Sequence, residues 1–219
     1  YQYLPLRSKT TFTASQFNKR IASKSNSSSK MYNKGQVFID NQNKYGINAS
    51  LMFGIAYNES QYGESSIAQS KNNLFGLNAV DKSPSQSADY FKNVDQCIKE
   101  FADHWMSKGY LNGSDWRYRG PHLGDKRSGI NVKYASDPYW GEKAATFAWA
   151  IDKELGNKDA FRYTIGVKNP YNSCIKTVLP VIIHHKGFGA TFSLVITASN
   201  SDGVYISPIA FILRVNNGV

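Results

Sequence analysis

The sequence predicts an α+β protein in which a mainly helical part, residues 1–168, precedes a short β-rich part, residues 169–219. Apolar side chains recur at helical spacing in several segments of the first part. The second part is rich in β-branched residues, is interrupted by Pro and Gly, and lacks helical periodicity, which is typical of short strands. With 219 residues, 41% of them hydrophobic, the chain is long enough for one full-sized core and a small appendage.

Two helices are expected near the start of the sequence. The stretch TASQ, from Thr13 to Gln16, is a capping box, and Phe17 and Ile21 follow it four residues apart. After a polar loop, a second helix is expected over residues 36–44.

A third helix is expected after Asn48, whose side chain suits the N-cap position. Its apolar residues share one face, namely Leu51, Met52, Ile55 and Ala56.

Glu59 comes four residues after Ile55, so at about 100° per residue it continues this face at the helix end. A carboxyl group there is partly desolvated, which raises its pKa and lets it hold a proton near neutral pH, as a general acid must. Glu64 follows Gly63, beyond the helix, and is expected to be exposed. A capping or salt-bridged carboxylate is the alternative reading of Glu59, and the residues alone leave it open.

A fourth helix is expected over residues 93–108. Its apolar face consists of Val94, Ile98, Phe101 and Trp105. Cys97 lies on or beside that face and is expected to be a buried, inert thiol. The other cysteine is Cys174, and two cysteines are too few for a disulfide scaffold or a cysteine-built zinc site.

The last helix has the clearest end signals. Asp137 is the expected N-cap, Pro138 the first helical residue, and Gly156 the stop. One stripe carries its apolar residues, namely Ala144, Phe147, Ala148, Ile151 and Leu155.

The charge balance indicates an anionic partner. Lys and Arg exceed Asp and Glu by 26 − 16, a net charge of +10, which favours nucleic acid, an anionic membrane surface or an anionic cell wall. No nucleic-acid-binding signature is visible, so we expect no nucleic-acid partner. No apolar run is long enough to span a membrane. The first residues lack an apolar stretch of signal-peptide type, so any export signal is expected to have been removed or to lie outside this sequence.

Three sequence pieces together resemble a known enzyme family. They are AYNESQYGES (56–65), NNLFGL (72–77) and YASDPYWGEKAA (134–145). In this order, across about 90 residues, they are similar to the family 73 glycoside hydrolases, the endo-β-N-acetylglucosaminidases of bacterial autolysins. The resemblance covers roughly residues 1–168.

The resemblance implies a lysozyme-like fold, with a helical lobe, a small β-lobe within residues 76–91, and a groove between them. It implies Glu59 as the catalytic acid. Glycoside hydrolysis also needs a second carboxylate or the acetamido oxygen of the substrate. Asp81, in an Ala-x-Asp-x-x-Pro context, is favoured slightly over Asp89, and a solvated turn residue is an equally open interpretation of either.

A groove for glycan needs flat apolar faces and polar donors. The candidate substrate-binding residues are Asn73, Phe75, Gly76, Tyr134, Tyr139 and Trp140. Gly76 can instead serve only to let the backbone turn, and Trp140 can be pure core.

The resemblance implies an enzyme that cleaves the β-1,4 bond between N-acetylglucosamine and N-acetylmuramic acid in peptidoglycan. A muramidase or lytic transglycosylase on the same fold, or a non-catalytic wall-binding protein, are the alternatives. We expect an extracellular, wall-associated monomer whose partners are peptidoglycan and anionic wall polymers.

No metal or other cofactor is expected. The four histidines show no ligand spacing beside a carboxylate or cysteine. His184 and His185 are adjacent in an expected strand, so their side chains point to opposite faces. The β-rich part is expected to form a small module; an SH3-like type is one possibility, and no motif in it is specific.

Overall fold

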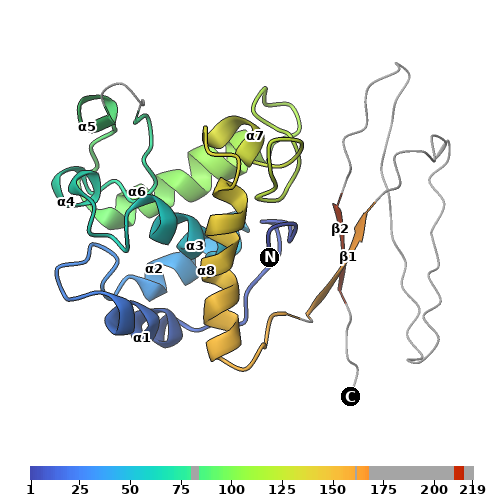
Figure 1. Ribbon diagram of the computed structural model, residues 1–219, viewed down its shortest axis with the longest axis horizontal. Helices are drawn as coiled ribbons and strands as arrows, with labels where there is room; N and C mark the ends of the chain where they lie inside the picture. The colour runs from blue at the N-terminus through green and yellow to red at the C-terminus, as the bar shows by residue number, and fades with distance from the viewer. Residues whose placement is uncertain (80–83, 161, 168–209, 215–219) are drawn as a thin grey trace.

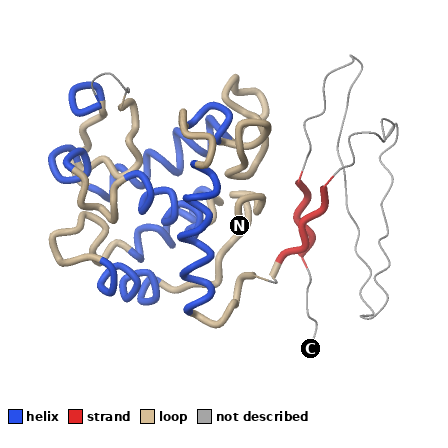
Figure 2. Tube along the Cα trace, in the orientation of Figure 1, coloured by secondary structure: helices blue, strands red, loops and turns tan. Residues whose placement is uncertain are grey.

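The computed structural model describes residues 1–79, 84–160, 162–167 and 210–214 (Figures 1 and 2). The described helices and strands are α1 (Ala14–Lys24), α2 (Gly35–Tyr45), α3 (Ala49–Glu59), α4 (Ser66–Lys71), α5 (Pro84–Ser87), α6 (Val94–Glu100), η1 (Phe101–Tyr110), α7 (Asn131–Tyr134), α8 (Trp140–Glu154), β1 (Tyr163–Val167) and β2 (Ala210–Arg214). The first part of the chain is therefore mainly helical, as predicted.

The first three helices meet at a cluster of phenylalanine rings. α1 begins at the predicted capping box, in which the side chains of Thr13 and Gln16 each accept a backbone N–H of the other. The ring of Phe17 lies 4.8 Å from that of Phe53 on α3, and Phe53 lies 5.3 Å from Phe38 on α2. All three rings are buried, so α1, α2 and α3 share one core.

α3 is the central helix. Asn48 is its N-cap, as predicted, and its side-chain oxygen accepts the N–H groups of Ser50 and Leu51 at 2.9 and 3.1 Å. The prediction of a single apolar face was too narrow, because every residue from Ala49 to Tyr57 is buried. The reason is that α8 and α2 both pack against α3, so no side of these three turns faces solvent.

The predicted helix over 93–108 is present, with Asn93 as N-cap, but its second half is wider than an α-helix. α6 continues directly into η1, a π-helical stretch. In a π-helix the hydrogen bonds join residues five apart instead of four. Met106, five residues after Phe101, is accordingly fully buried, whereas Trp105 is only partly buried. The expectation that Trp105 belongs to the core face was therefore wrong in part.

α8 begins later than predicted. Tyr139 occupies the N-cap position, and Asp137 lies in the turn before it. The Asp137 carboxylate accepts the backbone N–H of Tyr139 at 2.9 Å and the Lys143 ammonium at 2.6 Å. The helix end was predicted correctly, since Gly156 follows it with a left-handed φ of +87°.

The described part of residues 76–91 contains the short helix α5 and turns, without a strand, so the expected β-lobe is not seen there. β1 pairs antiparallel with β2, from Tyr163 opposite Arg214 to Val167 opposite Ala210. This pair joins segments on both sides of the expected domain boundary at residue 168. Cys174, the two adjacent histidines and all of the expected SH3-like module except residues 210–214 lie outside the described residues.

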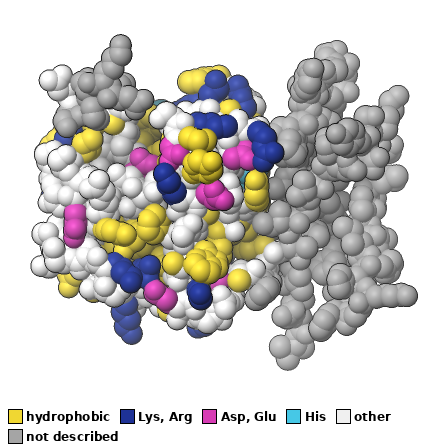
Figure 3. Space-filling view, viewed as in Figure 1, with side chains coloured by type: hydrophobic (Ala, Val, Ile, Leu, Met, Phe, Trp, Pro, Cys, Tyr) yellow, Lys and Arg dark blue, Asp and Glu magenta, His cyan; other side chains and the backbone are white. Residues whose placement is uncertain are grey.

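Cationic side chains are spread over the visible face of the helical body instead of gathering in one patch (Figure 3). Several are paired, for example Arg20 with Glu154 and Lys34 with Asp95. Within the described residues, no helix is long and apolar enough to cross a membrane.

Candidate active site

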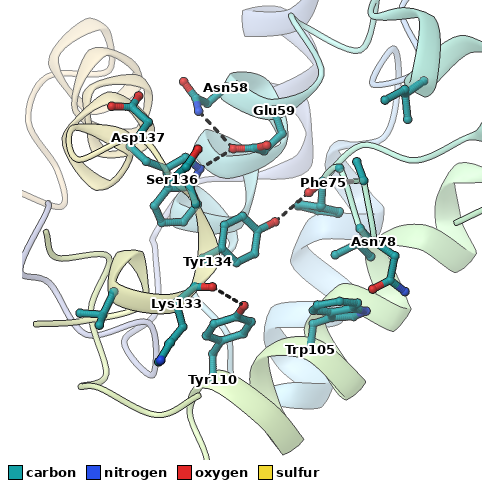
Figure 4. A pocket seen from close by; sticks show the side chains of 17 residues that line it. Asn58, Glu59, Phe75, Asn78, Trp105, Tyr110, Lys133, Tyr134, Ser136 and Asp137 are labelled. Atoms are coloured by element: carbon teal, nitrogen blue, oxygen red, sulfur yellow. Dashed lines mark hydrogen bonds between the residues drawn. The ribbon is translucent and has the colours of Figure 1, made fainter. Parts of the chain in front are cut away.

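A pocket of about 1030 Å³ opens beside the end of α3 (Figure 4). Its walls come from that helix end, from the turn after α4, from η1, and from the segment that leads through α7 to the start of α8. The lining residues are Asn58, Glu59, Ile67, Phe75, Gly76, Leu77, Asn78, Ala79, Trp105, Tyr110, Val132, Lys133, Tyr134, Ala135, Ser136, Asp137 and Trp140.

Glu59 is the last residue of α3, and its half-buried carboxyl group faces this pocket. Its Oε1 accepts hydrogen bonds from the indole N–H of Trp140 and from the amide of Asn58, the latter at 3.3 Å. Burial raises the pKa of Glu59, and the negative charge of Asp137 raises it further, while the two hydrogen bonds lower it. Burial is the largest of these influences, so the carboxyl group favours its protonated form more than an exposed glutamate does.

Gly76 faces the other oxygen of the same carboxyl group. Its backbone is left-handed, with φ +60°, and a Cβ atom at this position would lie 3.4 Å from Oε2 of Glu59. The glycine therefore leaves open the space in front of Oε2.

Asn73, a predicted substrate-binding residue, has another place in the structure. It is 1% exposed and does not line the pocket. Its amide donates to the carbonyls of Leu77 and Asp89, and its oxygen accepts the N–H groups of Phe75 and Leu77. Because every polar atom of the side chain is used to fold the turn after α4, none is left for a ligand.

Phe75 and Tyr134 are coupled across the pocket. The Phe75 ring is 1% exposed and stacks on Phe101 at 3.7 Å, so it supplies wall and not the open flat face that was expected. Its carbonyl oxygen accepts the Tyr134 hydroxyl at 2.8 Å. Tyr134 thereby ties the segment before α8 to the turn after α4.

The two aromatic residues at the start of α8 lie in different places, Trp140 at the Glu59 pocket and Tyr139 outside it. Trp140 is 2% exposed, and it reaches the pocket through the indole N–H that contacts Glu59. Its ring lies 4.5 Å from that of Tyr134. Tyr139 is 63% exposed and lines a different depression, together with Tyr3 and Arg127, so the structure does not bring it to Glu59.

Of the other carboxylates, Asp81 lies outside the described residues. Asp89 accepts the Asn78 amide on both oxygens, at 3.0 and 2.9 Å, and does not line the pocket. Glu64 is exposed, as predicted. Asp137 does line the pocket, although the sequence interpretation gave it only a capping role. The sequence signal that could have indicated this position is that Asp137 lies in the piece YASDPYWGEKAA, between Tyr134 and Trp140.

Cys97 is fully buried, and burial raises the pKa of its thiol to about 12, which agrees with an inert thiol. In the part of the chain that the structure describes, no three His, Cys, Asp or Glu side chains lie close enough together to hold a metal ion.

Comparison with solved structures shows the fold. A catalytic mutant of Staphylococcus aureus Autolysin E, in complex with the disaccharide NAG-NAM, matches with a TM-score of 0.54 at 22% identity, over 71% of this chain and 73% of the other. The same Autolysin E in complex with the muropeptide NAM-L-Ala-D-iGlu matches with a TM-score of 0.54 at 23% identity, over the same shares of the two chains.

Among curated proteins, this chain is 38% identical over 160 residues to a Streptococcus pneumoniae protein named "Putative endo-beta-N-acetylglucosaminidase". The match covers 73% of this chain but only 23% of that relative, so the chain spans about a quarter of its length. A family model, described as mannosyl-glycoprotein endo-β-N-acetylglucosaminidase, matches residues 35–153, which is more than half of the sequence and includes every residue that lines the pocket. The chain therefore belongs to the glucosaminidase family.

Proposed function

We propose that this protein is a peptidoglycan hydrolase that cleaves the β-1,4 bond between N-acetylglucosamine and N-acetylmuramic acid, with Glu59 as general acid. The observation that carries the proposal is the carboxyl group of Glu59. It is half-buried in a large pocket, it has a raised pKa, and only one of its oxygens is fixed by hydrogen-bond donors.

The two oxygens of Glu59 have different roles in the proposed mechanism, because one is held by hydrogen bonds and the other can carry the proton. Since Oε1 accepts N–H groups from Trp140 and Asn58, a proton on the carboxyl group belongs on Oε2, which faces the space left open by Gly76. As the bond from the anomeric carbon to the leaving oxygen breaks, that oxygen takes the proton from Oε2. The carboxylate that remains is stabilised by the same two donors.

A second group must act at the anomeric carbon, either by activating the water that bonds to it or by bonding to it first and then being displaced by water. We propose that this group is Asp81, with the acetamido oxygen of the substrate as the alternative. Asp89 and Asp137 are less suited, because each is already paired, with Asn78 and with Lys143 respectively. Replacing Asp81 with Asn distinguishes the two mechanisms. A loss as large as that of Glu59→Gln supports a second carboxylate, and a mild loss supports acetamido participation.

The substrate is supported by the solved relatives, since Autolysin E was crystallised with NAG-NAM and with a muropeptide. Of the predicted substrate-binding residues, Phe75, Gly76, Tyr134 and Trp140 line the Glu59 pocket. The net charge of +10 suits peptidoglycan carboxylates and the phosphates of wall polymers. We propose action outside the cell, at the wall, by a monomer.

The test is clearance of purified cell walls by wild type, Glu59→Gln and the matched exposed variant Glu64→Gln. Loss of the dissociable proton is expected to lower the rate by ~10²–10⁴-fold in Glu59→Gln, with Glu64→Gln close to wild type. A folded Glu59→Gln protein that clears walls normally would refute the site.

Mass spectrometry of the released fragments identifies the bond. Reducing-end N-acetylglucosamine is expected, whereas reducing-end N-acetylmuramic acid would show a muramidase and an anhydro product would show a transglycosylase.

A further inference from the structure

The end of the pocket away from Glu59 is built from residues that none of the three family-like sequence pieces contains. Trp105 and Tyr110 come from η1, and Asn78 comes from the turn after α4. We call these three residues the distal wall. In Figure 4, Tyr134 lies between Glu59 and this wall, so the pocket continues past the proposed acid.

The two rings of the distal wall are held from behind by an arginine. The Arg117 guanidinium lies 5.7 Å from the centre of the Trp105 ring and 5.2 Å from that of Tyr110. Asp115 fixes this guanidinium through two hydrogen bonds of 2.8 Å, and both charged side chains are only 17% exposed. Because the guanidinium holds both rings in place, their side chains lose little conformational entropy when a ligand binds.

Gly109 makes this arrangement possible. A Cβ atom at that position would overlap a guanidinium nitrogen of Arg117, so any larger residue would make the guanidinium move from its place beside the rings.

Asn78 adds an oriented polar atom beside the rings. Its amide nitrogen donates to both oxygens of Asp89, which fixes the direction of the amide group. The side-chain oxygen consequently points away from Asp89, and Figure 4 shows it on the side of the pocket interior.

A flat apolar face beside a fixed acceptor is the combination that a pyranose ring of an N-acetylated sugar requires, because the ring has one face of C–H groups and carries O–H and N–H donors at its edge. We propose that the distal wall is a saccharide subsite, where one ring of the glycan stacks on Trp105 and donates a hydrogen bond to Oδ1 of Asn78. The inference rests on the proposed function in that its ligand is the same glycan.

This subsite makes binding depend on chain length. In this proposal, a disaccharide bound at the Glu59 end leaves the distal wall empty, whereas a longer strand fills both ends of the pocket. The distal wall therefore selects strands over fragments without taking part in the chemistry.

The experiment measures binding by isothermal titration, with every protein carrying Glu59→Gln so that cleavage during the titration is slow. The probes are peptidoglycan glycan strands freed of their peptides, as disaccharide and as octasaccharide. Trp105→Ala is expected to weaken octasaccharide binding about tenfold, as loss of a stacked aromatic face does, and to leave disaccharide binding unchanged. Trp105→Phe should restore most of the loss.

A second variant allows the subsite to be tested even if Trp105→Ala does not fold. Asn78 has φ +57°, a conformation that glycine adopts without strain, so Asn78→Gly removes the amide at little cost to the fold. It should weaken octasaccharide binding about three- to tenfold through the lost hydrogen bond. Trp149→Ala, at an exposed tryptophan on α8 outside the pocket, is the matched control and should bind like the parent.

If Trp105→Ala and Asn78→Gly are folded and both show the same difference between octasaccharide and disaccharide as the parent, the subsite does not exist. Failure of the proposed function is a different result, seen in a separate assay of the protein with Glu59 intact. If that protein binds the octasaccharide but does not cleave it, the proposed function is wrong and the subsite remains.

Discussion

At Glu59, two opposing influences act on the same carboxyl group. Burial favours the neutral acid, and the N–H groups of Trp140 and Asn58 favour the carboxylate. A general acid needs both, because it must hold its proton before the reaction and be stable without it afterwards. Trp140, which the sequence suggested as a sugar-facing ring, instead acts on the substrate through Glu59 in the proposed mechanism.

Replacing Trp140 with Phe tests two effects of the indole on Glu59, namely the orientation of the carboxyl group and its pKa. The change removes a hydrogen bond that lowers the pKa of Glu59, so the pKa should rise and the alkaline limb of the kcat/KM profile should move to higher pH. The maximal kcat should nevertheless fall roughly 10–100-fold, because Oε1 is no longer fixed. A pH series of glycan hydrolysis measures both. Trp149→Phe, on the same helix, should change neither, and an unshifted alkaline limb in Trp140→Phe would contradict the contact.

Glu59→Gln should also change stability, and the sign depends on pH. Below the ordinary pKa of 4.5, the carboxyl group is protonated in the folded and the unfolded protein, so the variant and wild type should melt at similar temperatures. As pH rises through the raised pKa of the folded state, the wild type loses stability because the unfolded chain ionises more readily. The variant has no such loss, so its advantage in melting temperature should grow with pH. An advantage that shrinks with rising pH would mean that the pKa of Glu59 is lowered.

At the scale of elements, the site depends on how closely α3 and α8 approach. Glu59 ends α3 and Trp140 begins α8, so their hydrogen bond joins these two helices. The helices touch at Gly54, where a Cβ atom would lie 2.5 Å from the carbonyl oxygen of Ala144. The glycine allows the close backbone contact on which the alignment of Glu59 and Trp140 depends.

Gly54→Ala should therefore affect both fold and activity. The added methyl group must push α8 away, and such overpacking is expected to lower the free energy of unfolding by about 1–3 kcal/mol. Urea denaturation measures the loss, and wall clearance by the folded fraction should fall as well. Gly113→Ala is the matched control, since nothing lies within 4 Å of a Cβ atom there. Equal stability of the two variants would show that the helices do not meet at Gly54 as described.

At the scale of the whole molecule, the helical body contains every residue that lines the pocket, between positions 58 and 140. The chain beyond it is attached at Tyr163, whose hydroxyl accepts the backbone N–H of Lys9 at 3.0 Å and donates to its carbonyl at 3.1 Å. These contacts lie before residue 168, so they remain when the tail is removed.

A chain that ends at Lys168 is accordingly expected to cleave soluble glycan fragments at a rate close to that of the full chain, with weaker attachment to whole walls. Release of reducing sugar from fragments and sedimentation with purified walls measure the two properties. If the shortened protein is folded but inactive on fragments, the tail completes the groove or the core, and the expected division into 1–168 and 169–219 is wrong.

The sequence by itself determined the features that depend on neighbours along the chain. The caps Thr13 and Asn48 were predicted because a side chain at a helix start bonds to N–H groups two or three residues away. The place of Glu59 followed in the same way, since helical spacing puts it on the turn after Ile55. The family was likewise visible in three short pieces of sequence.

Only the tertiary structure decided what each polar or aromatic side chain near Glu59 contacts. Asn73 and Trp140 each lie in one of the three sequence pieces that resemble the family, yet Asn73 folds a turn and Trp140 donates to a carboxyl group 81 residues away. Trp105 was assigned to the core because a regular α-helix would put it there, and the π-helical turn instead places it on the pocket. These outcomes depend on how separate helices pack, and the packing is determined by all of the buried contacts together, which no local pattern encodes.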